Sequence, residues 1–88
     1  MIKILYDKSF LKSTKKLSSI LQPVLFDKIK ELEEYGISHS TLHVKTLSGK
    51  LSGFYSFRLN RSYRCLFHFV SQDMILLDEV AHRKDIYN

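Results

Sequence analysis

The residues best suited to chemistry are arginines placed inside an aromatic run. The stretch FYSFRLNRSYRCLFHF, residues 54–69, contains Arg58, Arg61 and Arg64. Arginine carries a planar guanidinium with five donors, a shape that matches phosphate and carboxylate groups. Arginines in such a run either face solvent as solubilising groups or converge on one anion. The first chemistry that they suggest is therefore the binding of a negatively charged group.

The distribution of charge favours convergence on an anion. The formal net charge is +5, and no Asp or Glu occurs between Glu34 and Asp73. That interval carries Lys45 and Lys50 as well as the three arginines, and the N-terminal half uses only lysine as its cation. This segregation favours a phosphate-binding surface on the C-terminal half. The alternative is a basic surface without a function.

The composition indicates one globular domain over residues 1–88. A hydrophobic share of 44% is typical of a chain that folds, and 88 residues support a single core. The lone Cys65 forms no internal disulfide, and no Cys/His spacing resembles a zinc site, so we predict a reducing compartment and no metal or other cofactor. No signal-peptide core and no membrane span of about 18 apolar residues is present. These features predict a cytoplasmic protein that is not embedded in a membrane.

A strand and a first helix are predicted near the N-terminus. Residues 2–6, IKILY, are mainly β-branched and aliphatic, which is typical of a strand. Asp7 or Ser9 follows as a candidate N-cap, and the first helix is expected to end near Leu17.

A longer amphipathic helix follows and is expected to end at Gly36. Two starts fit the sequence: a capping box from Ser19 to Gln22, or a start at Gln22 with Pro23 in the first helical position. One face of this helix is apolar and is formed by Ile20, Leu21, Val24, Leu25, Ile29 and Leu32. From Gly36 to about Lys45 the periodicity is lost, so an irregular segment is predicted.

Three strands are predicted in the C-terminal half, at residues 53–60, 62–70 and 74–82. Their connections have hairpin length, so an antiparallel three-stranded meander is expected. The fold class is therefore α+β, with an N-terminal strand, a two-helix hairpin and the meander, in the order β-α-α-β-β-β. Alternation places Arg58 and Arg64 on the non-aromatic faces of neighbouring strands, where they should approach each other on one open surface.

These segments resemble the RelE/ParE superfamily of bacterial toxins. The likeness rests on the order of elements and on the segments LSGFYSFRL, YRCLF and HRKDIY, and it spans nearly the whole chain. It implies a RelE-like fold and, from the RelE and YoeB branches, a ribosome-dependent mRNA endoribonuclease. The partners implied are mRNA, the ribosome and a cognate antitoxin protein. The alternative is a ParE-like toxin that inhibits DNA gyrase without nuclease chemistry.

The resemblance also implies roles for single residues. Cleavage of RNA through its own 2′-hydroxyl needs a proton acceptor, cations that stabilise the phosphorane, and a proton donor for the leaving 5′-oxygen. The match assigns Arg64 as the principal transition-state cation, Arg58 as the residue that orients the substrate, and Tyr87 as acid or base. The remaining predicted phosphate contacts are Arg61, Arg83, Lys45 and Lys50.

The chain departs from the family pattern at two positions. Lys45 stands where the YoeB branch has a carboxylate that acts as the base, so the base is either His82 or Tyr87. Ser56 stands where the RelE branch has a basic residue, and Lys50 is the candidate to replace that charge.

Overall fold

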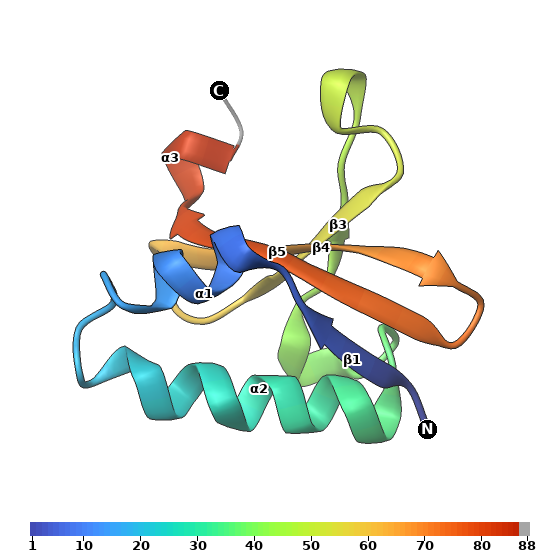
Figure 1. Ribbon diagram of the computed structural model, residues 1–88, viewed down its shortest axis with the longest axis horizontal. Helices are drawn as coiled ribbons and strands as arrows, with labels where there is room; N and C mark the ends of the chain where they lie inside the picture. Colours follow the sequence, from blue (N-terminus) through green and yellow to red (C-terminus); the bar gives the residue numbers. More distant parts are fainter. Residues whose placement is uncertain (87–88) are drawn as a thin grey trace.

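The computed structural model describes residues 1–86 and contains one mixed sheet with helices packed against it (Figure 1). Tyr87 and Asn88 lie outside the described residues. In chain order the elements are β1 (Lys3–Tyr6), α1 (Lys8–Thr14), α2 (Leu21–Tyr35), the 3₁₀ turn η1 (Ser40–Leu42), β2 (Lys45–Thr46), the 3₁₀ turn η2 (Gly49–Leu51), β3 (Phe54–Arg58), β4 (Tyr63–Ser71), β5 (Met74–His82) and α3 (Arg83–Ile86).

The sheet has five strands in the order β1-β5-β4-β3-β2. The predicted antiparallel meander of β3, β4 and β5 is confirmed. β1 joins it by parallel pairing with β5, from Lys3 opposite Met74 to Tyr6 opposite Leu77. The short strand β2, in a region predicted to be irregular, pairs with β3 and forms the other edge. The α+β class is therefore confirmed, and the sheet is wider than the meander alone.

Helix α2 runs along one face of the sheet (Figure 1). Its first residue is Leu21, and its N-cap residue, Ile20, makes no side-chain cap. The Leu21 N–H instead donates to the Ser18 hydroxyl at 3.4 Å, so the predicted capping box from Ser19 to Gln22 does not form. Pro23 is the third residue of the helix. The first N–H groups of any helix have no partner within it, so Pro23 removes no helical hydrogen bond. The helix ends at Gly36, as predicted, with φ of 77°, a conformation that favours glycine.

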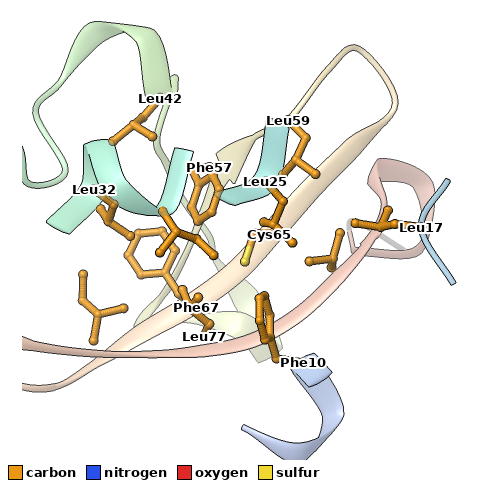
Figure 2. Close-up of a cluster of buried hydrophobic side chains, with 13 residues drawn as sticks. Phe10, Leu17, Leu25, Leu32, Leu42, Phe57, Leu59, Cys65, Phe67 and Leu77 are labelled. Atoms are coloured by element: carbon orange, nitrogen blue, oxygen red, sulfur yellow. The ribbon is translucent and has the colours of Figure 1, made fainter. Parts of the chain in front are cut away.

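The core lies between α2 and the sheet (Figure 2). Leu25 and Leu32 of α2 are fully buried with Phe57 of β3 and Phe67 of β4. Cys65 belongs to the same cluster and is fully buried. Burial raises the pKa of its thiol well above the usual value, which makes it a poor nucleophile.

Helix α1 covers a part of β5 that β1 does not reach. The pairing of β1 ends opposite Leu77. Beyond that point the Ser9 hydroxyl donates to the carbonyl of Asp78 at 2.7 Å, and the Val80 N–H donates to the Ser13 hydroxyl at 2.9 Å. Side chains of α1 thus form hydrogen bonds with the backbone of β5 where β1 no longer pairs with it. Within residues 1–86, no helix has the length and hydropathy needed to cross a lipid bilayer.

Replacing Ser13 with alanine should lower the free energy of unfolding by about 1–3 kcal/mol, because the part-buried Val80 N–H loses its acceptor. Urea denaturation measures this change. Ser19→Ala, at an exposed serine just before α2, is the matched control and should change stability by less than about 0.5 kcal/mol. Equal effects of the two substitutions would show that Ser13 does not stabilise the edge.

Candidate functional site

A strongly basic pocket of about 560 Å³ lies where the β3–β4 hairpin, the segment before β2 and the start of α3 meet. All four arginines of the chain line it. The residues around it are His43, Lys45, Arg58, Arg61, Arg64, Arg83 and Lys84. Within residues 1–86 no Asp or Glu is part of this lining. Six formal positive charges therefore share one open hollow, an arrangement suited to an anion with several charges.

The register of the sheet brings the strand residues together. Arg58 of β3 lies directly opposite Arg64 of β4, as alternation predicts. Lys45 of β2 lies opposite Ser56, which precedes Arg58 by two positions and therefore shares its face of the sheet. Like charges directly opposite each other destabilise an antiparallel pair. The arginine pair is thus unfavourable for folding, which is typical of a functional site.

The β3–β4 turn and α3 supply the other cations. The Asn60 side chain accepts hydrogen bonds from the backbone N–H groups of Ser62 and Tyr63 at 2.9 Å and 2.8 Å, which fixes the turn that carries Arg61. The Arg83 N–H donates to the carbonyl of Ser62 at 2.7 Å. This bond ties the start of α3 to the turn, so residues distant in the sequence lie beside one another.

Arg64 differs from the other cations because it is buried, with only 6% of its surface exposed. Its Nε donates to the Ser56 hydroxyl at 2.9 Å, and its Nη2 donates to the backbone carbonyl of His43. The side chain therefore reaches across β3 toward the segment that precedes β2. An open surface was expected for Arg64; it lines the pocket from a buried position instead and is held there by these contacts.

The structure gathers most, but not all, of the residues that the sequence singled out. Lys45, Arg58, Arg61, Arg64 and Arg83 line the basic pocket. Their roles in catalysis and RNA binding stay predictions.

Of the other three predicted residues, two have positions outside this lining and the third is not among the described residues. Lys50 is in η2, at the tip of the β2–β3 connection, and does not line the pocket. Tyr87 lies outside the described residues. His82 lies in a second groove together with Glu79 and Asp85, and its ring contacts Tyr63 edge-on with centroids 5.5 Å apart. His82 therefore does not line the basic pocket.

A β-bulge explains the position of His82. Leu66 pairs with Glu79, but the next residue of β4, Phe67, pairs with Leu77, so Asp78 is an extra residue in β5. A shift of one residue reverses the faces of all side chains that follow. His82 consequently shares the face of Tyr63, opposite which it lies, rather than the face of Arg64.

Two residues of the pocket were not predicted. Lys84 follows Arg83 directly, and its place in the segment HRKDIY was the available signal. His43 gave no periodic signal, because it lies in the irregular segment before β2. Its backbone is in the left-handed region, with φ 47° and ψ 52°, the one non-glycine residue with positive φ among residues 1–86.

Asp78, the extra residue at the bulge, forms a side-chain hydrogen bond with His68 outside the pocket. The Asp78 carboxylate lies 2.8 Å from Nδ1 of His68, and both side chains are partly buried. Burial raises the pKa of Asp78 above its usual value of 3.8, although the hydrogen bond from His68 opposes this shift.

This raised pKa predicts a pH dependence of stability. The folded state holds the Asp78 proton more tightly than the unfolded state, so the contribution of Asp78 is most favourable below pH 3.8 and is lost as the pH rises through the folded pKa. The stability of the wild type relative to Asp78→Asn should therefore increase as the pH falls through the acidic range. Urea denaturation of both proteins at several pH values measures this difference. A stability difference between wild type and Asp78→Asn that does not change with pH would show that the pKa of Asp78 is not raised on folding.

Comparison with solved structures identifies relatives that cover nearly the whole chain. A chain of the RelB–RelE antitoxin–toxin complex from Methanococcus jannaschii is 26% identical, with 94% of each chain covered and a TM-score of 0.75. A copper-bound mutant toxin from Helicobacter pylori is 21% identical over 98% of this chain and 99% of that chain, with a TM-score of 0.75. YafQ from E. coli is 10% identical, with both chains covered completely and a TM-score of 0.78.

No protein-family model and no curated protein matches the sequence. The likeness is therefore carried by the arrangement of elements, which is the same in proteins from several organisms. A further structural relative is described as a YoeB/ParE toxin from Agrobacterium tumefaciens, with a TM-score of 0.77. The chain has the fold of the RelE/ParE superfamily of toxins.

Proposed function

We propose that this protein is the toxin of a type II toxin–antitoxin system and acts as a ribosome-dependent mRNA endoribonuclease. The observation that carries the proposal is the basic pocket, which combines all four arginines with Lys45 and Lys84 and has no carboxylate in its described lining. RNA presents closely spaced phosphates, and such a pocket can contact more than one of them. The fold supports the proposal by analogy only.

The chemistry proposed is metal-independent cleavage through the 2′-hydroxyl. The 2′-oxygen loses its proton and attacks the adjacent phosphorus, the bond to the 5′-oxygen breaks, and that oxygen takes up a proton. The products are a 2′,3′-cyclic phosphate and a 5′-hydroxyl. The guanidinium of Arg64 stabilises the charge that develops on the phosphorane, and Arg58 orients the phosphate beside it.

Two residues are proposed for proton transfer. Tyr87 keeps the acid or base role that the sequence predicts for it. His43 lines the pocket, and imidazole is the side-chain type that gains and loses a proton near neutral pH. His82, the other predicted candidate, lies in the second groove, so His43 replaces it in the proposal.

The remaining cations hold the RNA and the ribosome. The pocket that Arg64 lines is also lined by Arg61, Arg83, Lys45 and Lys84, and we assign these four to phosphates on either side of the scissile one. A chain of 88 residues has little surface for reading bases, and the ribosome would hold the message in place. This role would place the protein in the cytoplasm. Lys50 is proposed to contact RNA outside the pocket, from the exposed tip of the β2–β3 connection.

A cognate antitoxin is the proposed protein partner. RelE of Methanococcus jannaschii was crystallised with its antitoxin RelB, and YoeB of Staphylococcus aureus with YefM. Such a partner would block access to the basic pocket. Acidic side chains on it would complement the six positive charges there.

The test adds purified protein to a reconstituted translation system that contains one defined message. Translation should stop, and primer extension should show cuts in the message within the translated region. The same message without ribosomes should be cut far more slowly. Intact mRNA in both reactions would overturn the proposal. If supercoiling by DNA gyrase were inhibited while mRNA stayed intact, the ParE-like alternative would take its place.

A further inference from the structure

Arg64 is held in place by two protein acceptors before any ligand arrives. We infer that Ser56 and the left-handed backbone at His43 are positioning groups, which fix the Arg64 guanidinium as the preformed base of an RNA phosphate site. The inference rests on the proposed function for the nature of the anion. It adds that a buried serine and a backbone turn determine how that anion is bound.

The Ser56 hydroxyl is the first positioning group. Ser56 is fully buried in β3, and Arg64 lies two positions before Leu66, the residue opposite Ser56 in β4. The hydroxyl accepts from Nε of Arg64 at 2.9 Å in an environment where both side chains are buried. A hydrogen bond to a charged group in such an environment is stronger than one at the surface. Ser56 thus contributes to the site although it does not line the pocket.

The backbone at His43 is the second positioning group. The carbonyl of His43 accepts from Nη2 of Arg64, so it binds the same guanidinium from the segment before β2. This contact depends on the left-handed conformation of His43, with φ 47° and ψ 52°. Leu42, which precedes it, is fully buried and anchors the turn in the core. Side chains other than glycine adopt this conformation at an energetic cost, which indicates that the geometry has a use.

The two acceptors act on different nitrogens of one planar group. Nε and Nη2 bind Ser56 and His43 respectively, so both the position and the plane of the guanidinium are set. A free arginine side chain loses much conformational entropy when it binds an anion. Arg64 has already lost that freedom on folding, so more of the interaction energy remains available for binding phosphate.

The inference is tested by binding, with a short single-stranded RNA that carries 2′-O-methyl groups and therefore cannot be cleaved. Ser56→Ala removes the acceptor of Nε and should weaken binding about tenfold. Ser56→Thr keeps a hydroxyl and suits a strand, so it should restore most of the affinity. Ser19→Ala, at an exposed serine before α2 and outside the pocket, is the matched control and should bind like the wild type.

A double-mutant cycle separates positioning from general structural damage. If Ser56 acts through Arg64, then Ser56→Ala should have no further effect on binding in a protein that already carries Arg64→Ala. A loss of the same size in both backgrounds would overturn the inference. The inference would also be overturned if the Ser56→Ala variant bound the RNA as tightly as the wild type.

The backbone role of His43 has its own pair of variants. Asparagine and valine both remove the imidazole, but asparagine tolerates the left-handed region and a β-branched residue does not. His43→Val should therefore bind the RNA more weakly than His43→Asn. Both variants are compared in the wild-type background and in a protein that carries Arg64→Ala. Equal affinities of the two variants would overturn this part, and the comparison holds even where Ser56→Ala fails to fold.

The binding assay also distinguishes the inference from the proposed function. A wild type that binds the RNA, with variants that are indistinguishable from it, overturns the positioning roles and leaves the nuclease proposal standing. A wild type that neither binds nor cleaves RNA overturns both.

Discussion

Replacing Arg64 with alanine should reduce mRNA cleavage in a translating system by about 10²- to 10³-fold, the usual effect of removing one preorganised donor to a charged transition state. Arg64 is the buried cation of the pocket, and two hydrogen bonds hold its guanidinium in place. Low exposure to water would strengthen the interaction of Arg64 with the phosphorane of the proposed reaction. The initial rate of cutting, followed by primer extension at saturating ribosomes, measures the effect.

Two further variants show whether charge or geometry is lost. Arg64→Lys keeps the charge but cannot donate from a fixed planar fork, so it should restore only part of the rate. Lys30→Ala removes one positive charge from the exposed surface of α2 and should leave the rate unchanged. Circular dichroism should show that all variants are folded. If folded Arg64→Ala cuts within about twofold of the wild type, Arg64 is not the transition-state cation.

Binding of single-stranded RNA should weaken steeply with salt, because six cationic side chains line the pocket. Each phosphate contact with a single strand contributes about −0.7 to the slope of log affinity against log salt concentration. With about four to six contacts, an increase from about 50 to about 200 mM salt should lower the affinity about 50- to 300-fold. Fluorescence anisotropy with a non-cleavable RNA measures this slope.

Single substitutions assign the slope to the pocket. Lys45→Ala or Arg83→Ala should make it less steep by about 0.7 each, because one counterion fewer is released. Lys30→Ala should leave the slope unchanged. A flat salt dependence in the wild type would mean that the pocket does not bind the RNA backbone, whatever the activity of the protein.

Much of the fold follows from periodicity and glycine placement. Alternating apolar residues predict β3, β4 and β5, and Gly36 marks the end of α2. The strand β2 has only two residues, too few for a periodic pattern, and becomes visible only through its pairing with β3. The parallel pairing of β1 with β5 joins distant segments, and no local pattern reports it.

The candidate site was predictable where it depends on strand alternation. Alternation places Arg58 and Arg64 opposite each other, and the structure agrees. His82 was a candidate through the resemblance and not through alternation, and the bulge at Asp78 places it on the face opposite to that of Arg64. Burial of Arg64 was not predictable from its own strand, since the acceptors come from Ser56 and from the turn at His43.

The parallel pairing of β1 has a consequence for synthesis on the ribosome. Among the strands within residues 1–86, β5 is the partner of β1. A growing chain therefore exposes β1 with an unmatched edge until Met74 and the residues after it have left the exit tunnel. Arg83 and Lys84 emerge later still. The nascent protein consequently lacks a finished basic pocket while most of it is being made.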